Sequence, residues 1–241
     1  MANGVYQSME LSNKPCGCNI VIVLKSNVYE LPSGMTSILI KRKKQSDLYW
    51  STIGEQALSS VDDLNVIFED RNTISGVEYT YAAIPVIDGK EGVGVSDTIK
   101  CSFQGWYIAD KTGEYVVGLN VKTSKKKNTA LSYIQTLASP YPYAVSNGKL
   151  NYFSGTFTGL FLPMKDGKFT REGAFTYKEK VIEFLSNGFS KIIKSGEGEA
   201  MKIRVDEAVD LAQSDFLDAN EISFTYTQIG DFPATGLVKI E

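Results

Sequence analysis

The stretch FLSNGFSKIIKSGEG, residues 184–198, decides how the second half of the chain is read. It places glycines, serines and lysines close together, as phosphate-binding loops do. In those loops, however, the glycines follow a strand and precede the helix whose first backbone amides hold the phosphate. Here the helical pattern comes first, and Asn187 and Gly188 suit the end of that helix, because both residue types adopt the left-handed backbone conformation. The order of elements therefore excludes a nucleotide loop and predicts a helix, a strand and a tight turn.

Working outward from this stretch, the sequence predicts one helix in the second half, over residues 171–187. Apolar side chains recur there at helical spacing on one stripe. They are Ala174, Tyr177, Val181 and Leu185, with Phe184 beside them. After the helix, the pattern predicts a strand over 189–194, a turn over 195–198 and a second strand over 201–205.

Short β-branched and aromatic runs, separated by turn residues, predict strands in most of the remaining chain. These runs are 20–24, 37–42, 48–53, 66–68 and 77–87 in the first half, and 114–121 and 150–161 in the second. Only residues 55–64 of the first half suit a short helix. The lysine run 125–127 is expected in a solvated loop, because lysine strongly prefers exposure. The predicted fold class is mainly β.

Composition and charge exclude several classes of function. The chain of 241 residues has a net charge of −3 and contains no histidine. This charge gives no electrostatic reason to expect a nucleic-acid partner. The lack of histidine removes most zinc sites, and it removes nucleophile pairs that depend on an imidazole base. No catalytic, cofactor-binding or metal-binding residue is predicted.

Three groups of reactive side chains have the composition of a metal site or a catalytic site, but the spacing or the surroundings of each group favour a structural or solvated role. Cys16 and Cys18 resemble half of a metal site, but with Cys101 as the only other cysteine there is no second half. Glu179 and Glu183 stand four residues apart on the predicted helix, on a face that would not desolvate them for acid–base chemistry.

The acidic segment 206–210, followed by Asp215 and Asp218, has the composition of a calcium loop. It lacks the regular spacing of ligands and the closing glutamate of such a loop. A solvated loop is therefore the prediction for this segment, and no metal site is assigned to it.

The N-terminal residues show neither the basic region nor the apolar region of a signal peptide. The longest purely apolar run, 20–24, is far shorter than the roughly 20 residues that a membrane helix needs. We therefore expect a soluble protein with no membrane partner.

The stretch GVEYTYAAIPVIDGKEGVGVSDTIKC, residues 76–101, resembles the last strands of a fibronectin type III domain. Tyr79 and Tyr81 are the candidates for its core tyrosines, and Asp88-Gly89 lies in its last hairpin. Trp50 lies where such domains often place a core tryptophan. The resemblance implies a β-sandwich over residues 15–101 that binds or spaces other parts, since such domains rarely catalyse.

The second half is similar to tail and baseplate proteins of phages that infect Gram-positive bacteria. Four motifs occur in the order of that family. They are SPYPY at 139–143, NYFSGT at 151–156, the helix with its FLSNG end, and ISFTYTQIGD at 222–231. The chain departs from the family pattern with Tyr226 in place of Trp, Gln228 in place of Glu, and Phe189 in the loop.

This second resemblance implies a tail-tube-like β-barrel flanked by one helix. It also implies a structural protein of the virion tail or baseplate, assembled in the bacterial host cytoplasm. Such a protein would form or join a ring, a trimer or a hexamer, near the tail tip and would bind itself and other tail proteins. The expected organisation is an N-terminal arm (1–14), the fibronectin-like domain (15–101) and the tail-tube-like domain (102–241).

A glycan-binding module is the alternative, because the chain has 13 Tyr, 12 Phe and 2 Trp that could stack on sugars. An exposed row of Trp106, Tyr107, Tyr141 and Tyr143 around a cleft would favour it. A carboxylate-based glycoside hydrolase is a third possibility, and it needs two acids facing each other across a groove. The sequence nominates no such pair.

Overall fold

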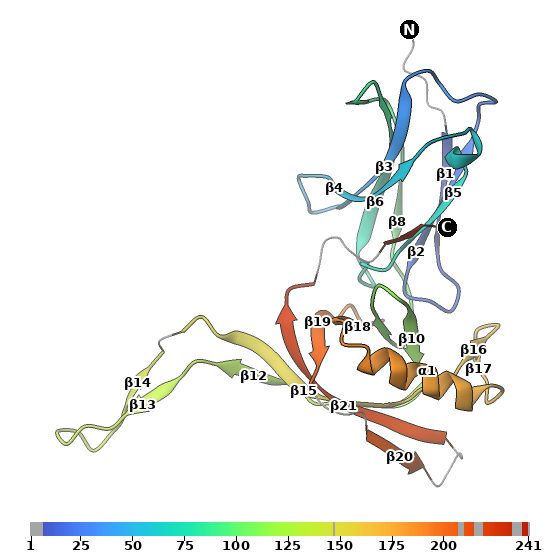
Figure 1. Cartoon of the computed structure of the whole chain (residues 1–241). Coiled ribbons are helices and arrows are strands. Elements are labelled where there is room, and N and C mark those ends of the chain that lie inside the picture. Colours follow the sequence, from blue (N-terminus) through green and yellow to red (C-terminus); the bar gives the residue numbers. More distant parts are fainter. Residues whose placement is uncertain (1–6, 147, 207–209, 215–218, 233–237, 241) are drawn as a thin grey trace.

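The structure is a computed structural model of the chain. It describes all residues except 1–6, 147, 207–209, 215–218, 233–237 and 241. The chain is mainly β, with curled sheets that form a half-barrel, which confirms the predicted fold class. Two β units follow each other along the chain, and the second one carries the α-helix (Figure 1).

The first unit is built from two antiparallel sheets. Its strands are β1 (Gln7–Asn13), β2 (Ile20–Ser26), β3 (Met35–Lys44), β4 (Ser51–Ala57), β5 (Val66–Asp70), β6 (Glu78–Ile87), β7 (Lys90–Glu91), β8 (Val95–Lys100) and β22 (Val238–Ile240). One sheet has the order β1-β2-β5-β22, and the other has the order β4-β3-β6-β7 with β8 also paired to β6. The core lies between the two sheets.

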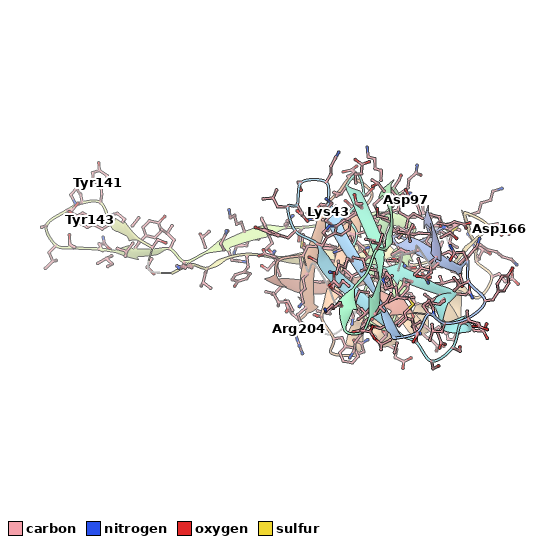
Figure 2. The ribbon with its side chains drawn as sticks, turned by 90° about the horizontal axis from the view of Figure 1, so that it is seen from above. Lys43, Asp97, Tyr141, Tyr143, Asp166 and Arg204 are labelled. Atoms are coloured by element: carbon pink, nitrogen blue, oxygen red, sulfur yellow. The ribbon has the colours of Figure 1, made fainter. Side chains whose placement is uncertain are left out.

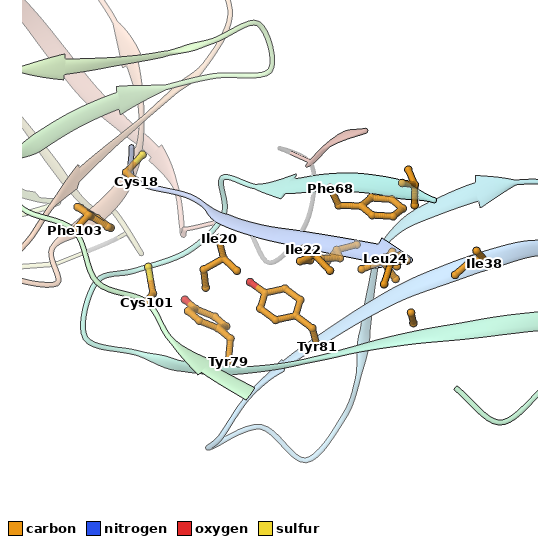
Figure 3. Close-up of a cluster of buried hydrophobic side chains, with 14 of the residues drawn as sticks. Cys18, Ile20, Ile22, Leu24, Ile38, Phe68, Tyr79, Tyr81, Cys101 and Phe103 are labelled. Atoms are coloured by element: carbon orange, nitrogen blue, oxygen red, sulfur yellow. The ribbon is translucent and has the colours of Figure 1, made fainter. Parts of the chain in front are cut away.

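Alternation along the strands fills this core, because every second side chain of a strand points to the same face. Ile20 and Ile22 of β2 are fully buried, and so are Tyr79 and Tyr81 of β6. Figure 3 shows the two isoleucines and the two tyrosines on facing strands of the core. The prediction that Tyr79 and Tyr81 are core residues is confirmed. The predicted hairpin is also present, since Asp88 and Gly89 connect β6 to β7 with positive φ angles of 49° and 71°.

The two ends of the chain differ from the predicted division. An N-terminal arm is predicted over 1–14, whereas residues 7–13 form β1 and pair with β2 along their whole length. Met9 and Leu11 on this strand pack against the core, which explains why it joins the sheet. Near the other end, β22 pairs with β5 of the first unit, although the expected second domain runs to residue 241.

Trp50 is not the core residue that the fibronectin resemblance implies. It lies in the turn between β3 and β4 and is 39% exposed, beside the more exposed Leu48 and Tyr49. The ammonium group of Lys43 lies 5.0 Å from the centre of its ring, a contact typical of a half-exposed aromatic side chain. The strand predicted over 48–53 starts only after this turn, at Ser51.

The short helix expected over 55–64 is reduced to a single 3₁₀ turn, Asp62–Leu64, because residues up to Ala57 belong to β4. Asp63 accepts hydrogen bonds from the backbone amides of Ser59 and Ser60, both at 2.7 Å. The hydroxyl of Ser59, which also donates to Asp63 at 2.7 Å, and these two backbone bonds lower the pKa of the exposed Asp63 carboxyl to about 2.

The second unit is one large curled sheet with a helix on one face. Its elements are β9 (Trp106–Ala109), β10 (Glu114–Val117), β11 (Leu119–Thr123), β12 (Lys126–Thr129), β13 (Ser132–Ile134), β14 (Tyr143–Val145), β15 (Asn151–Leu160), β16 (Met164–Lys165), β17 (Lys168–Phe169), α1 (Ala174–Ser186), β18 (Lys191–Ser195), β19 (Ala200–Val205), β20 (Asp210–Ser214) and β21 (Ala219–Gly230). The order is β10-β9-β18-β19-β21-β15-β11, with β12 also on β15 and β20 also on β21.

The opening stretch folds as the sequence predicts, within a few residues at each end. Helix α1 ends at Ser186, and Gly188 follows in the left-handed region with φ of 76°. Strands β18 and β19 then form a hairpin. The helix starts at Ala174 rather than near 171, because Gly173 is left-handed. It buries Val181, Phe184 and Leu185 of the predicted stripe against the sheet.

The strand predicted over 114–121 is divided at Gly118 into β10 and β11, which lie at opposite edges of the sheet. A side chain at residue 118 would lie about 3 Å from the ring of Phe169, so a larger residue at this crossing point would require that ring to move. The predicted lysine loop is exposed as expected, but Lys126 and Lys127 lie in β12. In the described part of the chain, no helix is long and apolar enough to cross a membrane.

Candidate assembly surface

A buried lysine joins the two units. Lys194 of β18 is fully buried, and its ammonium group donates hydrogen bonds to the backbone carbonyls of Cys18 (2.8 Å) and Arg71 (2.6 Å) in the first unit. Phe103, in the connection between the units, places its ring 5.6 Å from the same ammonium group. A buried charge needs such partners, because its desolvation is costly. Lys194 therefore ties the second unit to the first.

Further contacts hold the two units together. Lys14 forms ion pairs with Glu69 of the first unit (2.8 Å) and with Glu114 of the second (3.0 Å). Tyr107 and Val116 of the second unit belong to the buried core cluster of the first. The two units thus share apolar packing and buried polar contacts, so we treat them as one body.

The cysteines contribute to this junction rather than to a metal site. Cys16 is exposed, whereas Cys18 and Cys101 are buried. The Sγ of Cys18 donates to Oε2 of Glu114 at 3.3 Å. Among the described residues no group of His, Cys, Asp or Glu is arranged to hold a metal ion. The segment 206–210 and Asp215 and Asp218 lie wholly or partly outside the described residues.

Burial raises the pKa of Cys18 to about 12, from an ordinary value of 9.0. Between pH 9 and about pH 12 the folded state therefore keeps this proton, whereas the unfolded state releases it. The stability that the neutral thiol contributes is present below pH 9 and is lost as the pH rises toward 12. We expect Cys18→Ser, which cannot titrate there, to reduce the decline of the unfolding free energy with pH in denaturant titrations. The control is Cys16→Ser, at the exposed thiol, and it should leave the dependence of the unfolding free energy on pH as in the wild type. An equal dependence on pH for the wild type and Cys18→Ser would contradict the prediction.

The end of helix α1 is fastened to the sheet by a buried ion pair. The ammonium group of Lys191 lies 2.8 Å from Oδ2 of Asp110, and both side chains are almost fully buried. Asn187 donates from Nδ2 to the same carboxylate oxygen (3.0 Å) and accepts a hydrogen bond from Lys191. Lys191, one of the lysines that suggest a phosphate loop, thus makes internal contacts instead.

A long β-hairpin projects from this body and is here called the arm, residues 125–154 (Figure 1). Its root is the pairing of β12 with β15, and its outer part is the pairing of β13 with β14. From residue 126 to the tip near 138 the chain spans on the order of 30–40 Å, at about 3.3 Å per residue. Figure 2 shows the arm extending away from the body, with Tyr141 and Tyr143 near its tip.

The root of the arm is firmly held. Lys125 forms an ion pair with Glu199, and its ammonium group lies 4.5 Å from the ring centre of Phe153. The backbone amide of Phe153 donates to the side-chain oxygen of Gln228 at 3.1 Å. A side chain at Gly155 would collide with the backbone of the facing strand. The direction of the arm is therefore set by the sheet.

The outer part of the arm is apolar and uncovered. Its large exposed apolar side chains are Leu131, Tyr133, Ile134, Leu137, Tyr141, Tyr143 and Leu150. Two strands alone in water are marginally stable, and contiguous exposed apolar surface marks interaction sites. The arm is therefore the strongest candidate for a surface that another molecule covers.

The aromatic row that would favour glycan binding is not assembled. Tyr107 is buried and Trp106 is half-buried at a pocket of about 270 Å³, whereas Tyr141 and Tyr143 are exposed on the arm. A second pocket, of about 360 Å³, lies at the root of the arm, and Tyr152 is the single aromatic side chain that lines it. Neither pocket brings together the predicted four residues.

Glu179 and Glu183 lie on α1, and both are exposed. This arrangement is in keeping with the prediction of a solvated face.

No known protein family and no curated protein sequence matches the chain.

Two features of this surface were not predicted from the sequence, the projection of the arm and the burial of Lys194. A compositional signal for the arm is present: residues 125–154 contain four lysines and no aspartate or glutamate. For Lys194 there is no local signal, because its partners lie more than 100 residues away.

Proposed function

We propose that this chain is a structural protein of a bacteriophage tail or tail-like particle, and that it forms or joins a ring near the tail tip. The observation that carries the proposal is the apolar arm on a rigid β body. The order of the four tail-protein motifs adds the particular setting, a virion tail or baseplate assembled in a bacterial cytoplasm. The proposal assigns no catalytic, cofactor or metal residue.

A ring is favoured over a two-fold dimer by the position of the arm. The arm leaves the sheet at one end of the β15–β21 ladder, so it reaches away from the body on one side (Figure 1). A contact made by one end of a molecule with a different surface of the next is head-to-tail. When the rotation between copies closes, such contacts produce a ring.

The test is the mass of the purified chain by light scattering, with a variant that lacks only the outer arm. Thr129 and Asn151 face each other across the root, so residues 130–150 can be replaced by Asn-Gly, a two-residue hairpin turn. We expect a discrete trimer or hexamer for the wild type and a monomer with an unchanged melting temperature for the variant.

Equal assembly of the two proteins would contradict the role of the arm. A wild type that stays monomeric at every concentration and binds sugars on a glycan array, through Tyr141 and Tyr143, would favour the glycan-binding alternative.

A further inference from the structure

An exposed apolar loop projects from the first unit, in addition to the arm of the second. It connects β3 to β4, and at its end the side chains of Leu48 and Tyr49 are 88% and 83% exposed. Trp50 follows and is also exposed, with the ammonium group of Lys43 lying 5.0 Å from the centre of its ring. Such a run of consecutive exposed apolar residues is typical of a surface that binds another molecule.

Hydrogen bonds at its base hold the loop in place. The backbone amide of Lys44 donates to the carboxylate of Asp47 (3.2 Å), and the backbone amide of Asp47 donates to the carbonyl of Lys44 (3.0 Å). The backbone amide of Gln45 donates to the carbonyl of Glu78 on β6 (3.2 Å). The apolar residues 48–50 are therefore presented in a defined position, and they are here called the loop patch.

The loop patch lies on the side of the body from which the arm extends. Figure 1 shows the connection between β3 and β4 and the arm reaching to the same side. Figure 2 shows Lys43, the neighbour of Trp50, on that side of the body as well. One partner on this side can therefore contact both the arm and the loop patch.

A second exposed apolar surface lies at the opposite end of the second unit. Its residues, here called the end patch, are Leu119, Phe169 and Phe175. The ring of Phe169 lies beside Gly118, the residue before Leu119, and Phe175 is 67% exposed in the first turn of α1. Figure 1 shows β16 and β17, which precede α1, on the side away from the arm. Figure 2 shows Asp166, in the turn between these two strands, at the end opposite the tip of the arm.

Head-to-tail assembly covers both patches. A two-fold contact would bury one of them and leave the other exposed, because both subunits then use the same surface. A head-to-tail contact pairs two different surfaces, so that in a closed ring every copy has both patches covered. The patches alone are small, since a stable interface needs about 800 Å² per partner and a large aromatic side chain buries about 150–250 Å². The arm supplies further area when it lies along the next copy.

We propose that the loop patch of one copy packs on the end patch of a second copy of this chain, and that the arm of the first lies along the second. This inference rests on the proposed function and names the two surfaces that meet in the ring. Residues 131–145 of the arm carry no charged side chain. The contact is therefore mainly apolar and needs no acidic partner for the arm.

The test is a double variant on each side of the contact. The loop variant carries Leu48→Asp and Tyr49→Asp, and the end variant carries Leu119→Asp and Phe175→Asp. Each is expected to raise the concentration for half-assembly, measured by light scattering, by about tenfold or more, because carboxylates would be buried against apolar side chains. Mixed in equal amounts, the two variants should form a one-to-one dimer and nothing larger, because together they retain one intact loop patch and one intact end patch that can meet.

A matched control carries Tyr29→Asp and Val93→Asp, at two exposed apolar residues that belong to neither patch, and it should assemble as the wild type does. Circular dichroism and melting temperature show whether each variant is folded, and native mass spectrometry gives the composition of the mixture. If the wild type assembles and either patch variant assembles equally well, or the mixture forms no dimer, the pairing of the two patches is overturned while the ring stands. A wild type that never assembles overturns the proposed function together with this inference.

Discussion

Replacing Asp70 by alanine is expected to lower the free energy of unfolding by about 3–5 kcal/mol, the cost of breaking a buried ion pair from one side. Asp70 is fully buried. Its carboxylate accepts hydrogen bonds from the guanidinium of Arg42, from the hydroxyl of Tyr81 (2.9 Å) and from the backbone amide of Asn72 (2.9 Å). Arg42 is itself almost fully buried. Without the carboxylate, the Arg42 guanidinium would lose this charged partner and keep the neutral carbonyl of Asn72.

The measurement is urea unfolding monitored by tyrosine and tryptophan fluorescence. Asp97→Ala is the control, because Asp97 is an exposed residue of β8 and should change the unfolding free energy by less than about 0.5 kcal/mol. Tyr81→Phe removes one donor to the same carboxylate and should cost about 1 kcal/mol. A loss below about 1 kcal/mol for Asp70→Ala would show that the pair does not stabilise the junction between the two sheets.

The local elements of the fold were predictable from the sequence, because the signals for them lie within a few residues. Tyr79 and Tyr81 alternate into the core, and Asp88 with Gly89 closes the hairpin. The end of α1 was marked by Asn187 and Gly188. A strand period, a turn dipeptide and a helix cap each act at short range.

What the sequence did not disclose depends on contacts between distant segments. Lys194 reads as an exposed lysine on an alternating strand, and only the approach of Cys18, 176 residues away, buries it. The pairing of β22 with β5 is equally remote in sequence. For Trp50 the resemblance to fibronectin type III domains implied a core position, but the residue lies in an exposed turn between β3 and β4.

The arm shows the same difference between local features, which the sequence predicts, and long-range contacts, which it does not. The residues of the arm have ordinary strand and turn patterns, and nothing in those patterns says whether a hairpin packs on its own sheet or projects from it. That choice is made by the root, where β15 continues beyond its partners in the sheet and carries β12 with it. The absence of acidic residues from residues 125–154 is visible in the sequence. It indicates an interaction surface only when the structure shows that these residues project from the body.

Removing the two members of the Asp110–Lys191 pair one at a time should have unequal effects, with the larger loss for Asp110. Asp110→Ala would leave the buried ammonium group of Lys191 with two uncharged acceptors, on Asn187 and Phe189, and should cost about 3–5 kcal/mol. Lys191→Met keeps the apolar stem, and Asp110 would retain donors from Asn187 and Thr112. We expect a smaller loss there, of about 1–3 kcal/mol.

The Asp110 carboxylate also makes the free energy of unfolding depend on pH in acid. Burial alone would raise the pKa of Asp110, but hydrogen bonds from Asn187, Lys191 and Thr112 outweigh it and hold the pKa below its ordinary value. The stability from this group is therefore present above the ordinary pKa of 3.8 and lost as the pH falls through the lower folded value. Urea unfolding at pH 7 and pH 3 measures this dependence.

Lys180→Met, on the exposed face of α1, controls for the change of charge and should be close to neutral. The double variant Asp110→Ala with Lys191→Met closes a thermodynamic cycle, and its loss should be smaller than the sum of the single losses, because it leaves no unpaired charge. A larger loss for Lys191→Met than for Asp110→Ala would contradict the expected order of the two losses. Additive losses would mean that the two charges do not depend on each other. The helix would then be held to the sheet by Val181, Phe184 and Leu185 alone.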